Sequence, residues 1–170
     1  MQSDVRSPYL TMVTGPPGSM KSSFCLTLVS NHLNRTGEFG LYCTVEESLE
    51  SLRRTSQGMG IQLPPSLQLT GLAELRKEND SMDYLKFTKR MTEHFKEQHG
   101  DRFTTFVLDS LGAIYSLTDA DEDMRKKMFS FFDFLRSLDL NVFIVTERQV
   151  GGIAEIHGSE GFLVDGIINL

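Results

Sequence analysis

A glycine- and proline-rich loop stands between a strand-like and a helix-like segment near the start of the chain. Residues 9–14 (YLTMVT) are apolar and β-favouring, and residues 20–35 carry apolar side chains at helical spacing. The loop between them reads GPPGSMKS over residues 15–22. In a strand–loop–helix unit of this kind, backbone N–H groups surround phosphates and the helix N-terminus adds its positive dipole end. The feature therefore predicts an α/β protein that binds a nucleotide.

Each residue type in the loop has a defined task. Lys21 is placed to reach the β- and γ-phosphates, and the Ser22 hydroxyl is placed to bind Mg²⁺. The alternative is an ordinary turn before a helix, which the strand–loop–helix context disfavours. We expect the following residues to contact the nucleotide: Gly15, Pro16, Pro17, Gly18, Ser19, Met20, Lys21, Ser22 and Ser23.

Met20 departs from the standard motif G-x-x-x-x-G-K-[ST], which has a glycine at this position. Gly18 remains, and we expect the demanding backbone bend of the loop to lie there. A flexible methionine can fold aside against an apolar surface, so we expect nucleotide binding to survive. On this view, Met20→Gly tightens binding modestly and slightly lowers the stability of the free protein, because glycine is unfavourable at the start of a helix.

Strand-like and helix-like segments alternate through the rest of the chain. Strands are expected over residues 40–45, 67–70, 104–108, 141–146 and 162–170, and helices over residues 49–59, 80–98 and 119–138. The first helix is expected to place Phe24, Leu28 and Leu33 on one face, and Asp80 or Ser81 to cap the helix ending near residue 98. Because the strands are apolar on both faces, we expect a mainly parallel sheet covered by helices on both sides.

Composition excludes several classes of protein. The chain has 170 residues, of which 39% are hydrophobic and 24% charged, as in an ordinary globular domain. We find no run of about 18 apolar residues and no apolar signal core, so we expect a cytoplasmic protein without a membrane partner. Cys25 and Cys43 are expected to be reduced and semi-buried. A net charge of −6 makes nucleic acid an unexpected partner.

Three carboxylates follow strand-like segments. Asp109 ends the strand TTFVLD and is expected to contact Mg²⁺ beside the loop serine, although many buried strands end in an aspartate that only caps a turn. Glu46 and Glu47 follow the strand over residues 40–45, where ligands of open α/β sheets bind. Such a pair can hold and deprotonate a water molecule. The alternative is capping of the next helix, and Glu47 is the one we expect to serve structure if only one is catalytic.

Five segments together resemble a KaiC-type, RecA-like ATPase domain: GPPGSMKSS, LYCTVEESLESLRR, TTFVLDSLGAIY, VFIVTER and IHGSEGFLVDGIINL. They cover nearly the whole chain in order, and the glutamate pair followed by serine is characteristic of the KaiC branch. The resemblance implies ATP bound between neighbouring subunits, often in a hexameric ring. It further implies that Lys21 and Ser22 hold nucleotide and Mg²⁺, that Asp109 supports Mg²⁺, and that Glu46 and Glu47 are the catalytic carboxylates.

The resemblance also implies a function for the domain and an extent of the domain along the chain. We expect residues 1–170 to form a single domain that lacks further C-terminal strands. The implied function is a slow ATPase that acts as a regulatory switch through nucleotide-dependent self-assembly. One alternative is a nucleotide sensor without turnover. Another is a recombination accessory protein related to RecA paralogues. The acidic net charge and the glutamate pair disfavour this alternative.

Two further segments carry weaker signals. Glu147 and Arg148 follow the strand over residues 141–146, where they could sense the γ-phosphate or form an ordinary ion pair. Gly151 and Gly152 could belong to a loop facing a pore or DNA, with a plain loop as the alternative.

Overall fold

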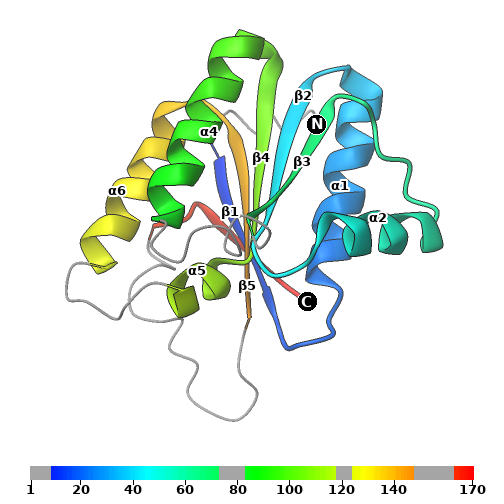
Figure 1. The fold of residues 1–170 in the computed structure, drawn as a ribbon, viewed down its shortest axis with the longest axis horizontal. Helices are drawn as coiled ribbons and strands as arrows, with labels where there is room; N and C mark the ends of the chain where they lie inside the picture. Colours follow the sequence, from blue (N-terminus) through cyan, green and yellow to red (C-terminus); the bar gives the residue numbers. More distant parts are fainter. Residues whose placement is uncertain (1–8, 73–82, 118–123, 148–162) are drawn as a thin grey trace.

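Six parallel strands form the centre of the molecule in a computed structural model that describes residues 9–72, 83–117, 124–147 and 163–170 (Figure 1). Their order across the sheet is β3-β2-β4-β5-β1-β6, and each pairing is parallel. The strands are β1 (Tyr9–Gly15), β2 (Phe39–Thr44), β3 (Leu67–Gly71), β4 (Phe103–Asp109), β5 (Asn141–Glu147) and β6 (Gly166–Asn169). The prediction of a parallel α/β sheet is confirmed.

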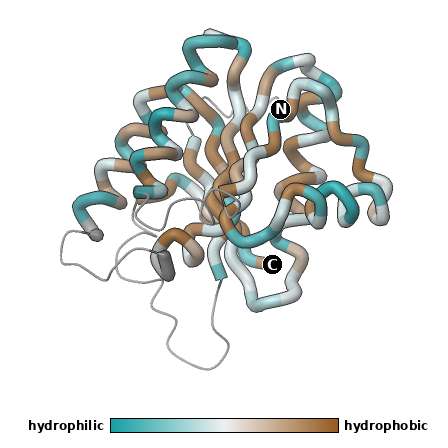
Figure 2. Tube along the Cα trace, viewed as in Figure 1, coloured by the Kyte–Doolittle hydropathy of each residue, from teal (hydrophilic) through white to brown (hydrophobic). Residues whose placement is uncertain are grey.

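Helices cover both faces of this sheet (Figure 1). Helices α1 (Lys21–Thr36) and α2 (Leu49–Gly58) lie on one face, and α4 (Tyr84–His99) and α6 (Met124–Ser137) on the other. Brown, apolar strands run between helices whose outer sides are largely teal in Figure 2. Two clusters of buried apolar side chains result, one on each face of the sheet. None of the helices in the described parts of the chain is long and apolar enough to cross a membrane.

The register of the strands brings the predicted site residues to one edge of the sheet. Gly15, the last residue of β1, pairs with Glu147 of β5. Thr44, the last residue of β2, pairs with Asp109 of β4. Because all these strands are parallel, their carboxyl ends meet at the same edge of the sheet.

The buried side of α1 includes Leu33 and part of Phe24 as predicted, but not Leu28. Leu28 is 39% exposed, and the residues that pack on the sheet are Cys25, Leu26, Val29 and Leu33. The stripe is centred on Leu26, Val29 and Leu33, which follow one another at spacings of three and four residues, and Leu28 is rotated away from its centre. Cys25 and Cys43 were expected to be semi-buried but are fully buried free thiols.

Helix boundaries differ from the predicted ones at two places. Asp83 caps α4 by accepting a hydrogen bond from the Lys86 N–H, whereas residues 80 and 81 lie outside the described part of the chain. Helix α5 (Leu111–Leu117) was not predicted. It is only seven residues long, so it covers too few turns to produce a clear helical periodicity. The expected start of the following helix at residue 119 also lies outside the described residues.

The side chain of Asp165, directly before β6, adds contacts to the parallel pairing of β6 with β1. Asp165 Oδ2 accepts a 2.8 Å hydrogen bond from the Leu10 N–H and a 3.0 Å bond from Arg136 Nη1. Arg136 also donates to the carbonyl oxygen of Leu163 at 2.9 Å. At the other end of β6, the Leu170 N–H donates to the Thr14 carbonyl at 2.9 Å. The C-terminal segment thereby reaches the start of the phosphate-loop region.

Candidate functional site

The loop between β1 and α1 contains two residues with left-handed backbone. Gly18 has φ of 80° and Met20 has φ of 64°. Only the first is glycine, for which this conformation carries no steric cost. The expected bend at Gly18 is present, and Met20, the residue preceding α1, also adopts a left-handed backbone.

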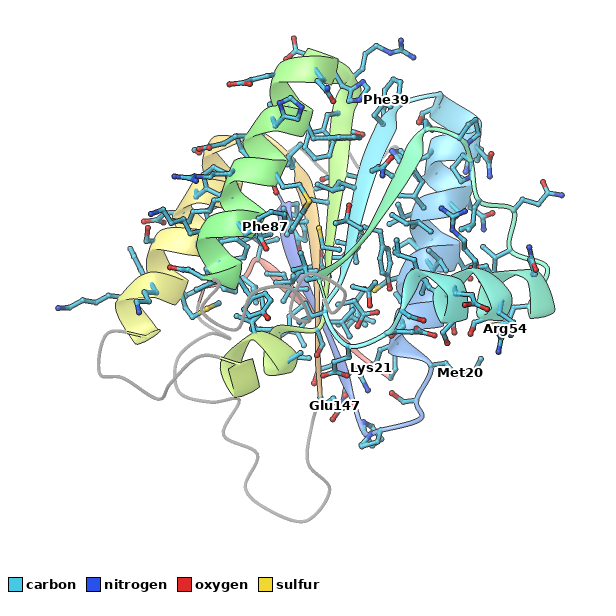
Figure 3. All side chains as sticks on the ribbon, viewed as in Figure 1. Met20, Lys21, Phe39, Arg54, Phe87 and Glu147 are labelled. Carbon is cyan, nitrogen blue, oxygen red and sulfur yellow. The ribbon has the colours of Figure 1, made fainter. Side chains whose placement is uncertain are left out.

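Met20 does not fold against an apolar surface as expected. Its side chain is 58% exposed and lies at the rim of the site (Figure 3). As the N-cap of α1, Met20 offers no side-chain acceptor to the first helical turn. The N–H groups of that turn therefore receive no hydrogen bond from the side chain of their N-cap residue, which suits an anionic ligand.

Lys21 lies beneath the loop, in the first turn of α1. Its side chain is largely buried, and Nζ donates to the carbonyl oxygens of Gly15 at 3.1 Å and Pro16 at 2.8 Å. The ammonium group is thus held against the loop whose N–H groups would surround phosphates. A cation in this position balances anionic oxygens bound to the same loop.

Gly15 is a position where the backbone approaches two other groups closely. A Cβ atom added there would lie 2.5 Å from Ser19 Oγ and 2.6 Å from the Leu170 carbonyl oxygen. Ser19 Oγ is itself buried without a hydrogen-bond partner among the described residues. The loop is therefore packed too closely at Gly15 to accept a side chain there, and the Ser19 hydroxyl is enclosed beside it.

Asp109, at the end of β4, is held by two hydroxyl groups. Tyr42 Oη donates to Asp109 Oδ2 at 2.6 Å, and the Ser22 hydroxyl also hydrogen-bonds to the carboxylate. Burial raises the pKa of Asp109 above its ordinary value, and Glu47 adds to this, whereas the two hydroxyls and Lys21 oppose it. Burial also raises the pKa of Tyr42, and the charge on Asp109 raises it further. Tyr42 is therefore a neutral hydrogen-bond donor.

The two glutamates after β2 have different partners. Glu46 Oε1 accepts a 3.1 Å hydrogen bond from Ser110 Oγ, next to Asp109. Glu47 Oε1 instead accepts a 2.6 Å bond from Ser51 Oγ in the first turn of α2, while its backbone N–H donates to Thr44 Oγ1 at 3.1 Å. The same helix is capped by Ser48, whose side chain accepts from the Ser51 N–H. Glu46 is thus turned toward the cleft, and Glu47 toward the helix.

These elements enclose a cleft of about 280 Å³ at the carboxyl edge of the sheet. Figure 3 shows Lys21, Met20 and Glu147 gathered at this edge, with Phe39 at the opposite end of the strands. The lining residues are Gly18, Met20, Lys21, Ser22, Ser23, Glu46, Asp109, Ser110, Val145 and Glu147. Gly15, Pro16, Pro17 and Ser19 belong to the same loop without lining the cleft, and Glu47 does not line it either.

The cleft suits a phosphate ester with a hard cation. Loop N–H groups and Lys21 offer donors for phosphate, and the Ser22 hydroxyl and Asp109 carboxylate offer the oxygen ligands that Mg²⁺ prefers. The described residues contain no group of three or more His, Cys, Asp or Glu side chains placed to hold a metal ion by themselves. This composition fits Mg²⁺, which binds through one or two carboxylates together with substrate phosphates and water.

Sequence reasoning did not identify Tyr42, Ser110 or Val145 as members of the site. Ser110 directly follows Asp109, and that adjacency was an available signal. Tyr42 lies two residues before the end of β2 and reaches Asp109 only through the pairing of β2 with β4. Arg148, Gly151 and Gly152, which were considered above, lie outside the described residues.

The fold is similar to that of a solved KaiC-like protein from the hyperthermophilic archaeon Pyrococcus horikoshii. The TM-score is 0.73 at 18% sequence identity, and the match covers 96% of this chain and 71% of that one. Identity this low supports similarity of fold alone. The predicted RecA-like architecture is confirmed by this comparison.

Curated relatives carry the same family name. The circadian clock oscillator protein KaiC of Prochlorococcus marinus is 25% identical over 170 residues, covering 94% of this chain and 33% of that protein. The circadian clock protein KaiC3 of Synechocystis sp. is 25% identical over 172 residues, covering 93% of this chain and 32% of that protein. The chain thus spans about a third of the length of these relatives.

A family model for the KaiC ATPase matches residues 5–170, almost the entire sequence. The match includes the phosphate loop, the glutamate pair and the strand that ends at Asp109. With the fold and the cleft described above, it shows that this chain belongs to the KaiC ATPase family.

Proposed function

We propose that this chain binds Mg²⁺-ATP in the cleft and hydrolyses it slowly, and that nucleotide binding drives self-assembly and so acts as a regulatory switch. The observation that carries the proposal is the convergence of Lys21, Ser22, Asp109 and Glu46 on one cleft. Lys21 and the other residues from Gly15 through Ser23 would bind the phosphates. Ser22 and Asp109 would hold Mg²⁺, which would neutralise phosphate charge when bound.

Glu46 is the residue proposed to orient and deprotonate the attacking water. Its carboxylate lines the cleft, and the hydrogen bond from Ser110 fixes one oxygen. A general base needs a defined position within hydrogen-bond reach of the water. Glu47 is the second carboxylate of the proposed catalytic pair. Its bond to Ser51 supports a role in holding the segment after β2, through which it would keep Glu46 in place.

Self-assembly is proposed from family membership and from the charges in the cleft. Among the described lining residues, Lys21 is the single cation, whereas Glu46, Asp109 and Glu147 are acidic. Stabilising the charge that develops on transferred phosphate calls for further cations. A neighbouring copy of the chain, as in a hexameric ring, would be one source of them, and would couple turnover to assembly.

The experiment that tests the proposal measures ATP turnover and Mg²⁺-ATP binding side by side across a range of protein concentration. Turnover per subunit that rises with concentration supports an ATPase completed at a subunit interface. Absence of Mg²⁺-ATP binding at any concentration contradicts the proposal.

A nucleotide sensor without turnover is the second candidate. The observation in its favour is that Lys21 is the single cation among the described residues lining the cleft, which suffices to bind phosphate but supplies little stabilisation of the transition state. Tight binding with no turnover at any protein concentration would select this candidate.

A further inference from the structure

Among the acidic residues that line the cleft, Glu147 is the one without a partner in the described parts of the chain. It ends β5, where its register partner on β1 is Gly15, the first residue of the phosphate loop. Its side chain is exposed at the cleft, near Lys21 (Figure 3). No hydrogen bond or ion pair joins its carboxylate to another described residue, whereas Glu46 and Asp109 each accept a hydrogen bond from a neighbouring hydroxyl group. The charge of Glu147 is therefore open to a group from outside the subunit.

Glu147 and a bound phosphate cannot contact each other directly while both are ionised. An ionised carboxylate accepts hydrogen bonds and donates none, and the same holds for the oxygens of an ionised phosphate. Two such groups side by side also repel each other, because they carry the same charge. The group that joins Glu147 to a nucleotide in the cleft must consequently be a donor, either a cation or a water molecule.

The charge balance of the cleft favours a cation over a water molecule. Lys21 is the single cation among the described lining residues, and its ammonium group already donates to two carbonyl oxygens of the loop. Glu46, Asp109 and Glu147 are acidic, and ATP carries more negative charge than one Mg²⁺ neutralises. A water molecule would bridge Glu147 to the phosphates without compensating either charge.

We infer that Glu147 receives an Arg or Lys side chain of a neighbouring copy of this chain, so that the cation lies between its carboxylate and the phosphates of ATP. The inference rests on the proposed function, because the cation is needed when nucleotide occupies the cleft. A second copy can supply it, since the chain carries exposed cations without an ion-pair partner among the described residues, such as Arg53 on α2 and Arg90 on α4. Glu147 then repels ATP in the single subunit and attracts the neighbour in the assembly.

The test compares Glu147→Gln with the wild-type protein in two measurements. Titration with a fluorescent ATP analogue and Mg²⁺, at a protein concentration far below that of assembly, gives the affinity of the single subunit. Light scattering at saturating Mg²⁺-ATP gives the protein concentration of half-maximal assembly. Glu147→Gln should bind nucleotide about two- to fivefold more tightly, because an exposed like charge is removed. It should need at least about tenfold more protein to assemble, because the neighbour's cation loses its carboxylate.

Two further variants separate this role from a general effect of charge. Glu93→Gln makes the same change at an exposed glutamate of α4 that does not line the cleft, and should leave both quantities within about twofold of the wild type. Glu147→Asp keeps the charge on a shorter side chain and should assemble more readily than Glu147→Gln. Thermal melting of each variant without nucleotide reports on folding.

The inference requires the two quantities to move in opposite directions. Assembly that is not weakened in Glu147→Gln, or subunit affinity that is not raised, overturns it. Lower turnover with unchanged assembly would assign Glu147 to a water molecule instead, and a fall in both quantities would assign it a structural role. A wild type that binds Mg²⁺-ATP but stays monomeric at every concentration overturns the inference and leaves nucleotide binding intact. If the wild type does not bind Mg²⁺-ATP, the proposed function fails first, and the role of Glu147 fails with it.

Discussion

Ser110 Oγ donates a 3.1 Å hydrogen bond to Glu46 Oε1, which joins the residue after β4 to the residue two positions after β2. Glu47, the next residue, accepts instead from Ser51 on α2. Neighbouring glutamates with such different partners should respond differently to substitution. The pair can therefore be separated by experiment.

Glu46→Gln should reduce ATP turnover by about 100-fold or more, because the amide keeps the shape but cannot accept a proton from water. Its affinity for Mg²⁺-ATP should stay within about threefold of the wild type. Glu47→Gln should reduce turnover by less than about tenfold, since its carboxylate contacts the helix. Phosphate release and calorimetry measure the two quantities. Normal turnover in the Glu46→Gln, Glu47→Gln double variant would show that both carboxylates only support structure.

Lys21→Ala should weaken ATP binding by at least about tenfold, which corresponds to about 1.4 kcal/mol, because a charge-assisted contact to phosphate is lost. Lys86→Ala is the matched control, because Lys86 is an exposed lysine on α4. Calorimetry with ATP measures both. Equal affinities in the two variants would mean that the loop does not bind phosphate.

Met20→Gly should stabilise the free protein, which reverses the expectation from sequence. At φ of 64°, methionine adopts a conformation that is unfavourable for L-residues, whereas glycine adopts it freely. The gain should be about 0.5–1 kcal/mol, or a rise in Tm of about 1–4 °C.

Gly18→Ala is the matched control for Met20→Gly. Gly18 has φ of 80° and no atom within 4 Å of an added Cβ, so strain alone should lower the stability by about 1 kcal/mol.

ATP affinity of Met20→Gly should rise modestly, because the exposed side chain at the rim of the cleft is removed. A fall in both Tm and ATP affinity would mean that Met20 makes stabilising contacts that outweigh the strain.

Asp165→Asn should destabilise the protein at pH 7 by about 1 kcal/mol, a value reduced for the partial exposure of this carboxylate. Burial raises the pKa of Asp165, but hydrogen bonds from Arg136 and the Leu10 N–H outweigh it and hold the pKa below the ordinary value of 3.8. The stabilisation is therefore present above pH 3.8 and lost as the pH falls through the lower pKa of the folded protein. Urea unfolding at pH 7 and at about pH 3 should show a difference between variant and wild type that shrinks in acid. A difference independent of pH would exclude the charge as its cause.

Mg²⁺-ATP should promote self-association of the chain, because a ligand that binds the assembled form more tightly shifts the equilibrium toward it. Light scattering with and without Mg²⁺-ATP measures this response. Lys21→Ala should not respond at the same ATP concentration. A strict monomer under both conditions would favour the nucleotide-sensor function.

The sequence by itself determined the features that depend on short-range order. Alternating apolar segments predicted the parallel sheet, and residues 15–22 between a strand and a helix predicted the phosphate loop. These features could be predicted because they depend on residues close together in the sequence: the spacing of apolar side chains within one helix or strand, and the glycines within one loop. Asp109 was identified in the same way, from its place at the end of an apolar strand.

Only the tertiary structure decided which side chains meet. The buried residues of α1 depend on how that helix is rotated against the sheet, so Leu28 was misplaced. Met20 takes a left-handed backbone because the loop must close between β1 and α1. The pairing of β2 with β4 brings Tyr42 to Asp109 and Glu46 to Ser110, whereas Glu47 contacts Ser51. The two strands are separated by 58 residues between Thr44 and Phe103. Contacts across such distances depend on the order of the strands in the sheet, which no local pattern of residues encodes.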